Sequence, residues 1–168
     1  MKWLRKIFGG PSVKEPKGIS LGENAKWVIS GVQDQVIFFS NLKYIFPEPD
    51  YILFFEGIVI ADDVKKYFDE NSVPNPAEIA AGTLWPKPKT YHILLTNKSI
   101  EDLVSFSKQH ASCEICDHFH VYKDNVIYLE WHDAWGKDPI LCYREINDIN
   151  LKRFCENTGG KLELYPGV

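Results

Sequence analysis

A short hairpin in the second half of the chain constrains the fold more than any other feature of the sequence. The run Val121-Tyr-Lys-Asp-Asn-Val-Ile127 places Asp124 and Asn125, two residues that tolerate positive φ, between β-prone side chains. A two-residue turn of this kind fixes the pairing of the strands on either side of it. The sequence therefore predicts an antiparallel strand pair around Asp124-Asn125.

The same turn predicts which side chains share a face of the hairpin. Counting outward from the turn gives five expected cross-strand pairs: Lys123 with Val126, Tyr122 with Ile127, His120 with Leu129, His118 with Trp131, and Asp117 with His132. Because side chains alternate along a strand, one face is expected to carry Cys116, His118, His120, Tyr122, Ile127, Leu129 and Trp131. The other is expected to carry Asp117, Phe119, Val121, Val126, Tyr128, Glu130 and His132. Both faces become polar far from the turn, so we expect a functional site there.

The rest of the chain alternates between strand-like and helix-like segments. Strands are expected at residues 26–30, 51–60, 90–96 and 161–164. Helices are expected at 33–44, with Val32, Val36, Ile37 and Phe39 inward, from Asp62 or Asp63, from a capping box at Ser99, and from Asn147 or Asp148 to Gly159. This order predicts an α+β fold: a single domain with a mixed, mostly antiparallel sheet of roughly six or seven strands and three or four helices.

The first 22 residues differ from the rest of the chain in composition and pattern. Residues 2–8 place Trp3, Leu4, Ile7 and Phe8 opposite Lys2, Arg5 and Lys6, and residues 9–22 are rich in Gly and Pro. We expect an amphipathic tip on a flexible arm over residues 1–22, followed by one globular domain over 23–168. Residues 2–8 could make weak peripheral contact with a membrane surface, or the end could pack on its own domain.

Charge and cysteine usage limit the classes of partner. The chain has 19 Lys and Arg against 23 Asp and Glu, a net charge of −4, and no basic stripe beyond its first residues. Nucleic acid is therefore not an expected partner. The N-terminus lacks the apolar run of a signal peptide, and no window resembles a transmembrane segment. We expect a cytoplasmic protein whose four cysteines are reduced thiols.

A metal site is one hypothesis for the residues at the polar end of the hairpin. Cys113, Cys116, His118 and His120 offer thiolates and imidazoles at short spacing, a mixture that zinc accepts. His118, His120 and His132 form an alternative three-ligand set suited to a metal-dependent hydrolase. Against the first set, its Cys and His ligands crowd into a few residues without the usual separated pairs. The expected cofactor is none, or zinc.

Acid–base catalysis is a second hypothesis for the same end. Asp117 opposite His132 would form a carboxylate–imidazole pair, and Asp133 or Glu130 could replace Asp117 in that role. Cys113 or Cys116 could supply a nucleophile, although no nucleophile motif surrounds either thiol. The third hypothesis is structural, and the pattern favours it: the Asp–His pair would satisfy itself at a sheet end, and the cysteines would pack as small apolar side chains.

Tryptophans in polar loops point to binding. Trp85, Trp131 and Trp135 lie in or beside turn-rich segments, and His92 follows the first of them. Tryptophan anchors interfaces more often than most residues, so these loops could bind a protein partner or a small ligand. The alternative is that they fold back over the core. The sequence thus predicts a non-enzymatic binding protein, with a metal-dependent hydrolase or zinc-binding domain as the alternative.

Overall fold

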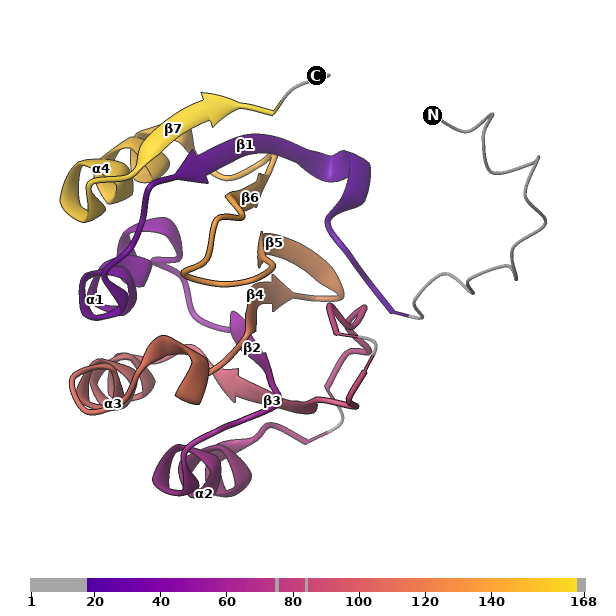
Figure 1. Cartoon of the computed structure of the whole chain (residues 1–168). Coiled ribbons are helices and arrows are strands. Elements are labelled where there is room, and N and C mark those ends of the chain that lie inside the picture. The colour runs from indigo at the N-terminus through magenta and orange to yellow at the C-terminus, as the bar shows by residue number, and fades with distance from the viewer. Residues whose placement is uncertain (1–17, 75, 84, 166–168) are drawn as a thin grey trace, which may run out of the picture.

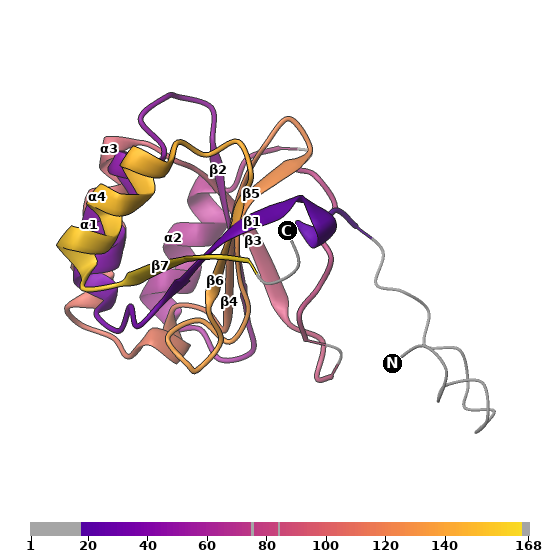
Figure 2. The same ribbon diagram turned by 90° about the horizontal axis from the view of Figure 1, so that it is seen from above.

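The structure, a computed structural model, describes residues 18–74, 76–83 and 85–165 of the 168-residue chain. Within them, seven strands form one antiparallel sheet of order β3-β2-β4-β5-β6-β1-β7, as Figure 1 shows from one edge to the other. Four α-helices cover one face of this sheet (Figure 2). The predicted α+β class is confirmed, whereas the predicted tip at residues 2–8 lies outside the described residues.

Most of the connections between the elements are short, and the longest runs over residues 72–88. The strands are β1 (Ala25–Ser30), β2 (Ile52–Gly57), β3 (Lys89–Leu94), β4 (His118–Lys123), β5 (Val126–Trp131), β6 (Ile140–Tyr143) and β7 (Lys161–Leu164). The α-helices are α1 (Gln35–Ile45), α2 (Asp62–Asn71), α3 (Asn97–Ser107) and α4 (Asp148–Thr158), with short 3₁₀ turns at η2 (Gly22–Asn24) and η3 (Ser112–Glu114). No described helix is long and apolar enough to cross a membrane.

Polar side chains cap the starts of α1, α3 and α4, whereas α2 begins after Ala61 without a side-chain cap. The Asp34 carboxylate accepts a hydrogen bond from the Ile37 backbone N–H at 2.9 Å and so begins α1. The capping box of α3 joins Thr96 to Ser99, so this helix starts before the predicted position at Ser99. At the end of α4, Gly159 has a φ of +72°, a left-handed conformation that glycine adopts without strain, as the sequence predicts.

The main core lies between the helices and the sheet. The buried side chains of α1 are Phe38, Phe39, Leu42 and Ile45. The Phe38 ring lies 5.4 Å from the Phe119 ring of β4 and 5.7 Å from the Phe154 ring of α4. The predicted inward face of α1 is wrong in part, because Ile37 is exposed. Phe38 takes its place in the stripe that meets the sheet, together with Leu42 one turn and Ile45 two turns further along.

Two irregular segments, residues 18–24 and 76–83, cover part of the other face of the sheet. The Ile19 N–H donates to the Glu78 carbonyl at 2.8 Å, and the Ala80 N–H donates to the Ile19 carbonyl at 3.0 Å. Beneath them a smaller core contains Leu21, Ala25, Phe54, Tyr122 and Ile127. Packing therefore begins before the predicted domain boundary at residue 23, since residues 18–22 are part of this cover.

Candidate functional site

A β-bulge decides which hairpin residues share a face. Tyr122 pairs with Ile127 as predicted, but Val121 pairs with Leu129, so Tyr128 is an extra residue on β5. Beyond the bulge His120 lies opposite Glu130 and Phe119 opposite Trp131. The predicted faces are wrong beyond this point, because one inserted residue moves every later side chain of β5 to the opposite face.

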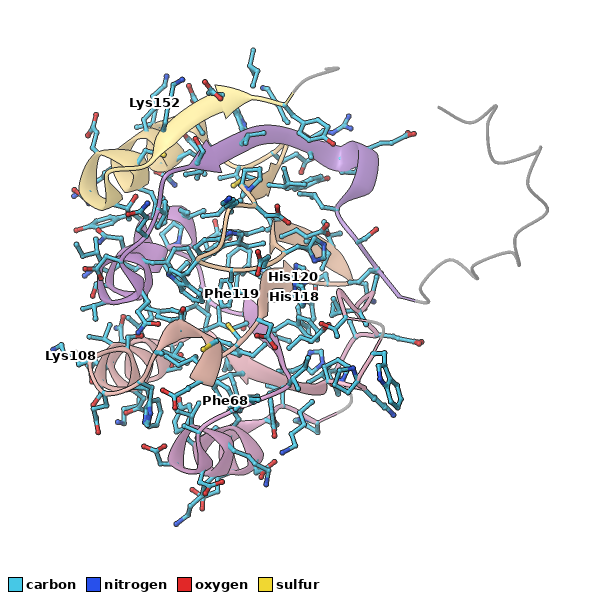
Figure 3. The ribbon with its side chains drawn as sticks, viewed as in Figure 1. Phe68, Lys108, His118, Phe119, His120 and Lys152 are labelled. Atoms are coloured by element: carbon cyan, nitrogen blue, oxygen red, sulfur yellow. The ribbon has the colours of Figure 1, made fainter. Side chains whose placement is uncertain are left out.

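The bulge brings the polar residues together on the face away from the helices. Glu130 and His132 of the β5 end join His118 and His120 of β4 there, while Phe119 points to the helices (Figure 3). The His132 ring centroid lies 5.3 Å from that of His118 and 5.1 Å from that of His120. We call this group, with Glu56 of β2, the histidine cluster.

The predicted Asp117–His132 pair is wrong. The Asp117 carboxylate accepts instead from the Ile58 backbone N–H at 2.9 Å. Asp133 is an exposed turn residue with a φ of +46°, and its backbone N–H donates to His118. Neither aspartate has a hydrogen bond or ion pair with His132 among the described contacts, because the bulge turns His132 toward Glu130.

Glu130 and His132 form the closest carboxylate–imidazole pair of the described histidine cluster, in which His118 Nε2 also lies 3.8 Å from Glu56 Oε1. The His132 Nε2 and the Glu130 Oε1 are 3.0 Å apart, and Glu130 Oε2 accepts from the Leu21 backbone N–H at 2.7 Å. The hydrogen bond with Glu130 raises the pKa of His132. Burial of Glu130 opposes its ionisation, but the hydrogen bonds from His132 and Leu21 outweigh it and lower its pKa. The pair therefore holds the 18–24 segment on the sheet.

Glu56 plays the same part for the second covering segment. Its carboxylate is fully buried and accepts from the backbone N–H of Gly82 at 3.0 Å and of Thr83 at 2.6 Å. A Cβ at position 82 would lie 2.7 Å from the His118 ring, so glycine permits this close approach. These contacts fix the base of residues 81–83 and 85–88, which we call the Trp85 loop.

Both ring nitrogens of His118 have hydrogen-bond partners, and these link the Trp85 loop to the turn at Asp133. Its Nδ1 accepts from the Asp133 backbone N–H at 3.0 Å, so its proton resides on Nε2, 3.0 Å from the Thr83 Oγ1. Burial lowers the pKa of His118, which favours this neutral form. With both nitrogens occupied, His118 has no free nitrogen for a substrate or a metal in this conformation.

His120 is the unusual member of the cluster. It is 1% exposed, and neither ring nitrogen has a hydrogen-bond partner among the described residues. Its ring stacks on Phe54 at 5.2 Å, and burial lowers its pKa to about 3. His92 on β3 is also buried, with Nδ1 3.0 Å from the Tyr122 hydroxyl and a pKa that burial lowers to about 4. Burial against a face of the sheet keeps both rings neutral. Because His92 is only 8% exposed, it does not present a binding surface.

The first predicted ligand set, Cys113 and Cys116 with His118 and His120, is not brought together. The rings of the second set, His118, His120 and His132, do lie near one another. Cys116 is buried in the helix-side core, where burial raises its pKa, and Cys113 is exposed in η3. His118 and His120 lie on the opposite face of the sheet. Among the described residues, no group of three or more His, Cys, Asp or Glu side chains is placed to hold a metal ion.

Two of the three tryptophans assigned to binding loops belong to the core. Trp131 is 2% exposed and donates from Nε1 to the Asp138 carbonyl at 2.9 Å. Trp135 is half-buried, with its ring 4.8 Å from the Trp131 ring and 5.6 Å from the Phe39 ring. The prediction that both present a binding surface is therefore corrected, since they cover the core. Trp85 differs from both, because 86% of it is exposed.

Sequence reasoning missed the structural importance of Glu56 and weighed Glu130 only as a substitute for Asp117. The signal was present in both cases. Each is an acidic residue inside an otherwise apolar strand, Ile-Leu-Phe-Phe-Glu-Gly and Val-Ile-Tyr-Leu-Glu-Trp. Because a buried carboxylate needs hydrogen-bond donors, such residues mark the points where another part of the chain covers the sheet.

Comparisons with known proteins add no relative from which a function could be inferred. No protein-family model matches the chain, and no curated protein or solved structure matches it.

Proposed function

We propose that this chain is a binding protein that contacts a protein partner through the Trp85 loop, with Trp85 as the anchoring side chain. The observation that carries the proposal is the exposure of Trp85, 86%, in a chain whose other described tryptophans are at least partly buried. Leaving a large aromatic ring in water forgoes a substantial burial energy, and tryptophan is enriched among residues that dominate interfaces.

The attachment of the loop supports this role. Buried Glu56 holds the backbone of Gly82 and Thr83, and His118 contacts both residues, so the base of the loop is ordered before any partner arrives. Ordering a loop in advance removes part of the entropy cost of binding. In this proposal the histidine cluster acts as a support for the loop and not as a catalytic centre.

The charges of the loop indicate the chemistry of the partner. Lys87 and Lys89 are exposed on either side of Pro88, close in sequence to Trp85. An apolar pocket rimmed by carboxylates on the partner would complement this arrangement, because opposite charges at a rim speed association and fix orientation. We place this binding in the cytoplasm, a location supported by four cysteines that are all free thiols.

Site-specific photo-crosslinking tests the proposal directly. A photoreactive residue replaces Trp85 in one variant and Ile149, an exposed apolar residue of α4, in a matched control. Both variants are expressed in the cells that make the protein, and crosslinked partners are identified by mass spectrometry. We expect a partner that crosslinks at position 85 and not at 149. Equal crosslinking at the two positions would contradict the assignment of the Trp85 loop.

The partner, once purified, permits a quantitative test by calorimetry. Trp85→Ala should weaken its affinity by about 2 kcal/mol or more, roughly 30-fold, as for other central aromatic anchors. Ile149→Ala should leave the affinity unchanged. A Trp85→Ala variant that binds as tightly as the wild-type chain would refute the anchoring role.

A second candidate, a zinc-binding domain or small metal-dependent hydrolase, rests on the convergence of three rings. His118, His120 and His132 lie near one another, and His120 has two nitrogens without partners among the described residues. For a metal to bind there, His118 must give up its present hydrogen bonds. Elemental analysis of protein purified without chelator, beside His120→Phe, tests it: stoichiometric zinc lost in the variant would support this candidate over the first.

A further inference from the structure

The outer edge of β7 has no partner strand among the described residues. β7 ends the sheet and pairs there only with β1, Glu163 lying opposite Val28 and Leu162 opposite Ile29 (Figure 1). The Tyr165 N–H donates to the Lys26 carbonyl at 2.7 Å. Because antiparallel pairs alternate, the backbone groups of residues 161 and 163 also point toward β1, and those of Leu162 and Leu164 point outward.

The side chains of β7 carry a short charge pattern on one face. Lys161 and Glu163 form an ion pair with each other and project away from the helices. Leu162 projects to the helix side, where it packs against the main core. Leu164, two residues further on, is 59% exposed. Among the described residues, the outer edge of β7 therefore offers unpaired backbone groups, one positive and one negative side chain, and an exposed apolar side chain.

We propose that this edge pairs with β7 of a second copy of the chain, antiparallel and about a two-fold axis through Leu162. In this register Lys161 of each copy faces the partner's Glu163, and Leu162 faces the partner's Leu162. The outward backbone groups of the two Leu162 residues then bond to each other. A two-fold arrangement uses the same patch on both copies and leaves no further edge at the junction.

The charges select this register from the alternatives. Hydrogen bonds across the new junction require the outward-pointing residues of one copy to pair with the outward-pointing residues of the other. Because every second residue of β7 points outward, the two-fold axis must pass through a residue and not between two residues. An axis through Lys161 would oppose two lysines, and one through Glu163 would oppose two glutamates. Like charges directly opposite destabilise a strand pair, whereas opposite charges stabilise it. The axis through Leu162 is the one that gives two attractive pairs.

The apolar surface beside the edge supports the same partner. Leu164, which ends β7, is 59% exposed. In the proposed register Leu164 lies opposite Gly160 of the other copy, so pairing covers part of its exposed surface. A contact built on so short a strand is small, so we expect a weak dimer that depends on concentration.

Sedimentation equilibrium of the full chain measures this dimer, and charge reversal tests its register. Glu163→Lys places lysines opposite lysines and should weaken dimerisation roughly tenfold or more. The double variant Lys161→Glu with Glu163→Lys restores opposite charges and should regain the wild-type dissociation constant. Glu70→Lys, an exposed change of the same charge on α2, is the control and should leave dimerisation unchanged.

Amide exchange identifies the edge and separates the outcomes. In the dimer the Leu162 and Leu164 N–H groups should become protected as concentration rises. A chain that stays monomeric at every concentration, with those N–H groups protected, would assign the edge to another segment of the same chain and overturn the proposal. A dimer that Glu163→Lys does not weaken, or that the double variant does not restore, would overturn it equally.

Discussion

Replacing Glu56 with glutamine should loosen the Trp85 loop without changing the shape of the side chain. The buried carboxylate of Glu56 accepts one hydrogen bond on each oxygen, from the backbone N–H groups of Gly82 and Thr83. A glutamine amide offers one oxygen and one NH₂ group. One of the two backbone N–H groups would then face a donor, so that hydrogen bond is lost and the loop must move away.

The magnitude follows from what the substitution removes. A hydrogen bond to a charged group contributes about 1.5–3 kcal/mol, and a buried N–H left without a partner costs about 1–3 kcal/mol. These two estimates describe the same lost contact and overlap. The loop can also reach water by detaching, which limits the loss. We therefore expect the free energy of unfolding to fall by about 2 kcal/mol, or a decrease in Tm of roughly 4–8 °C at this chain length.

Urea unfolding followed by circular dichroism measures the stability, and hydrogen exchange of the Gly82 and Thr83 amides measures the local effect. Glu78→Gln, an exposed acidic residue of the same covering segment, is the matched control and should stay within about 0.5 kcal/mol of wild type. If Glu56→Gln were equally neutral and both amides exchanged at the wild-type rate, Glu56 would not hold the loop, and the reasoning would be refuted.

Three further predictions concern the cluster and the thiols. His120→Phe keeps the stacking and removes two unpaired nitrogens, so its urea midpoint should equal or exceed that of wild type; a loss above about 1 kcal/mol would reveal a partner for the ring. As the pH falls from 6.5 to 4, the free energy of unfolding of His120→Phe should also decrease less than that of wild type. The reason is that wild-type His120, neutral in the folded state, takes up a proton on unfolding in this range. His132→Ala should lower the free energy of unfolding by about 1 kcal/mol, mostly between pH 4.5 and 6.5. The raised pKa of His132 stabilises the folded state below pH 6.5 and the lowered pKa of Glu130 stabilises it above pH 4.5, so both contributions are present in this window. A cost that does not depend on pH would contradict the pairing. A thiol reagent should modify Cys113 rapidly in the native protein and the three buried cysteines only in denaturant; a second fast thiol would contradict the burial.

Local signals predicted much of the fold. The Asp124-Asn125 turn appears with both residues at positive φ, and the last helix ends at Gly159 in the left-handed conformation. Turns and helix ends depend on neighbours in the chain, so the residues beside them suffice. The inward face of α1 was harder, because Ile37 and Phe38 are both apolar and only packing against Phe119 and Phe154 selects one of them.

The candidate site depended on a single residue that the sequence did not reveal. Tyr128 is the extra residue of a bulge, and its ring packs at 5.1 Å from the Tyr51 ring and 5.3 Å from the Tyr143 ring. Without the bulge Glu130 would share a face with Phe119, and His132 would meet Asp117. With it, Glu130 and His132 reach the histidine cluster. Two distant tyrosines surround the ring of the bulged residue, so the choice of face involves contacts far apart in the chain.

By itself the sequence determined the α+β class, the hairpin turn and the presence of polar residues at one end of the hairpin. These follow from periodicity and turn chemistry, which act over a few residues. Only the tertiary structure decided that Glu56 and Glu130 hold two distant segments on the sheet, that Trp131 and Trp135 cover the core, and that Trp85 faces water. Burial is the reason: whether a side chain is enclosed depends on what folds over it, and here the covering residues are up to 109 positions away.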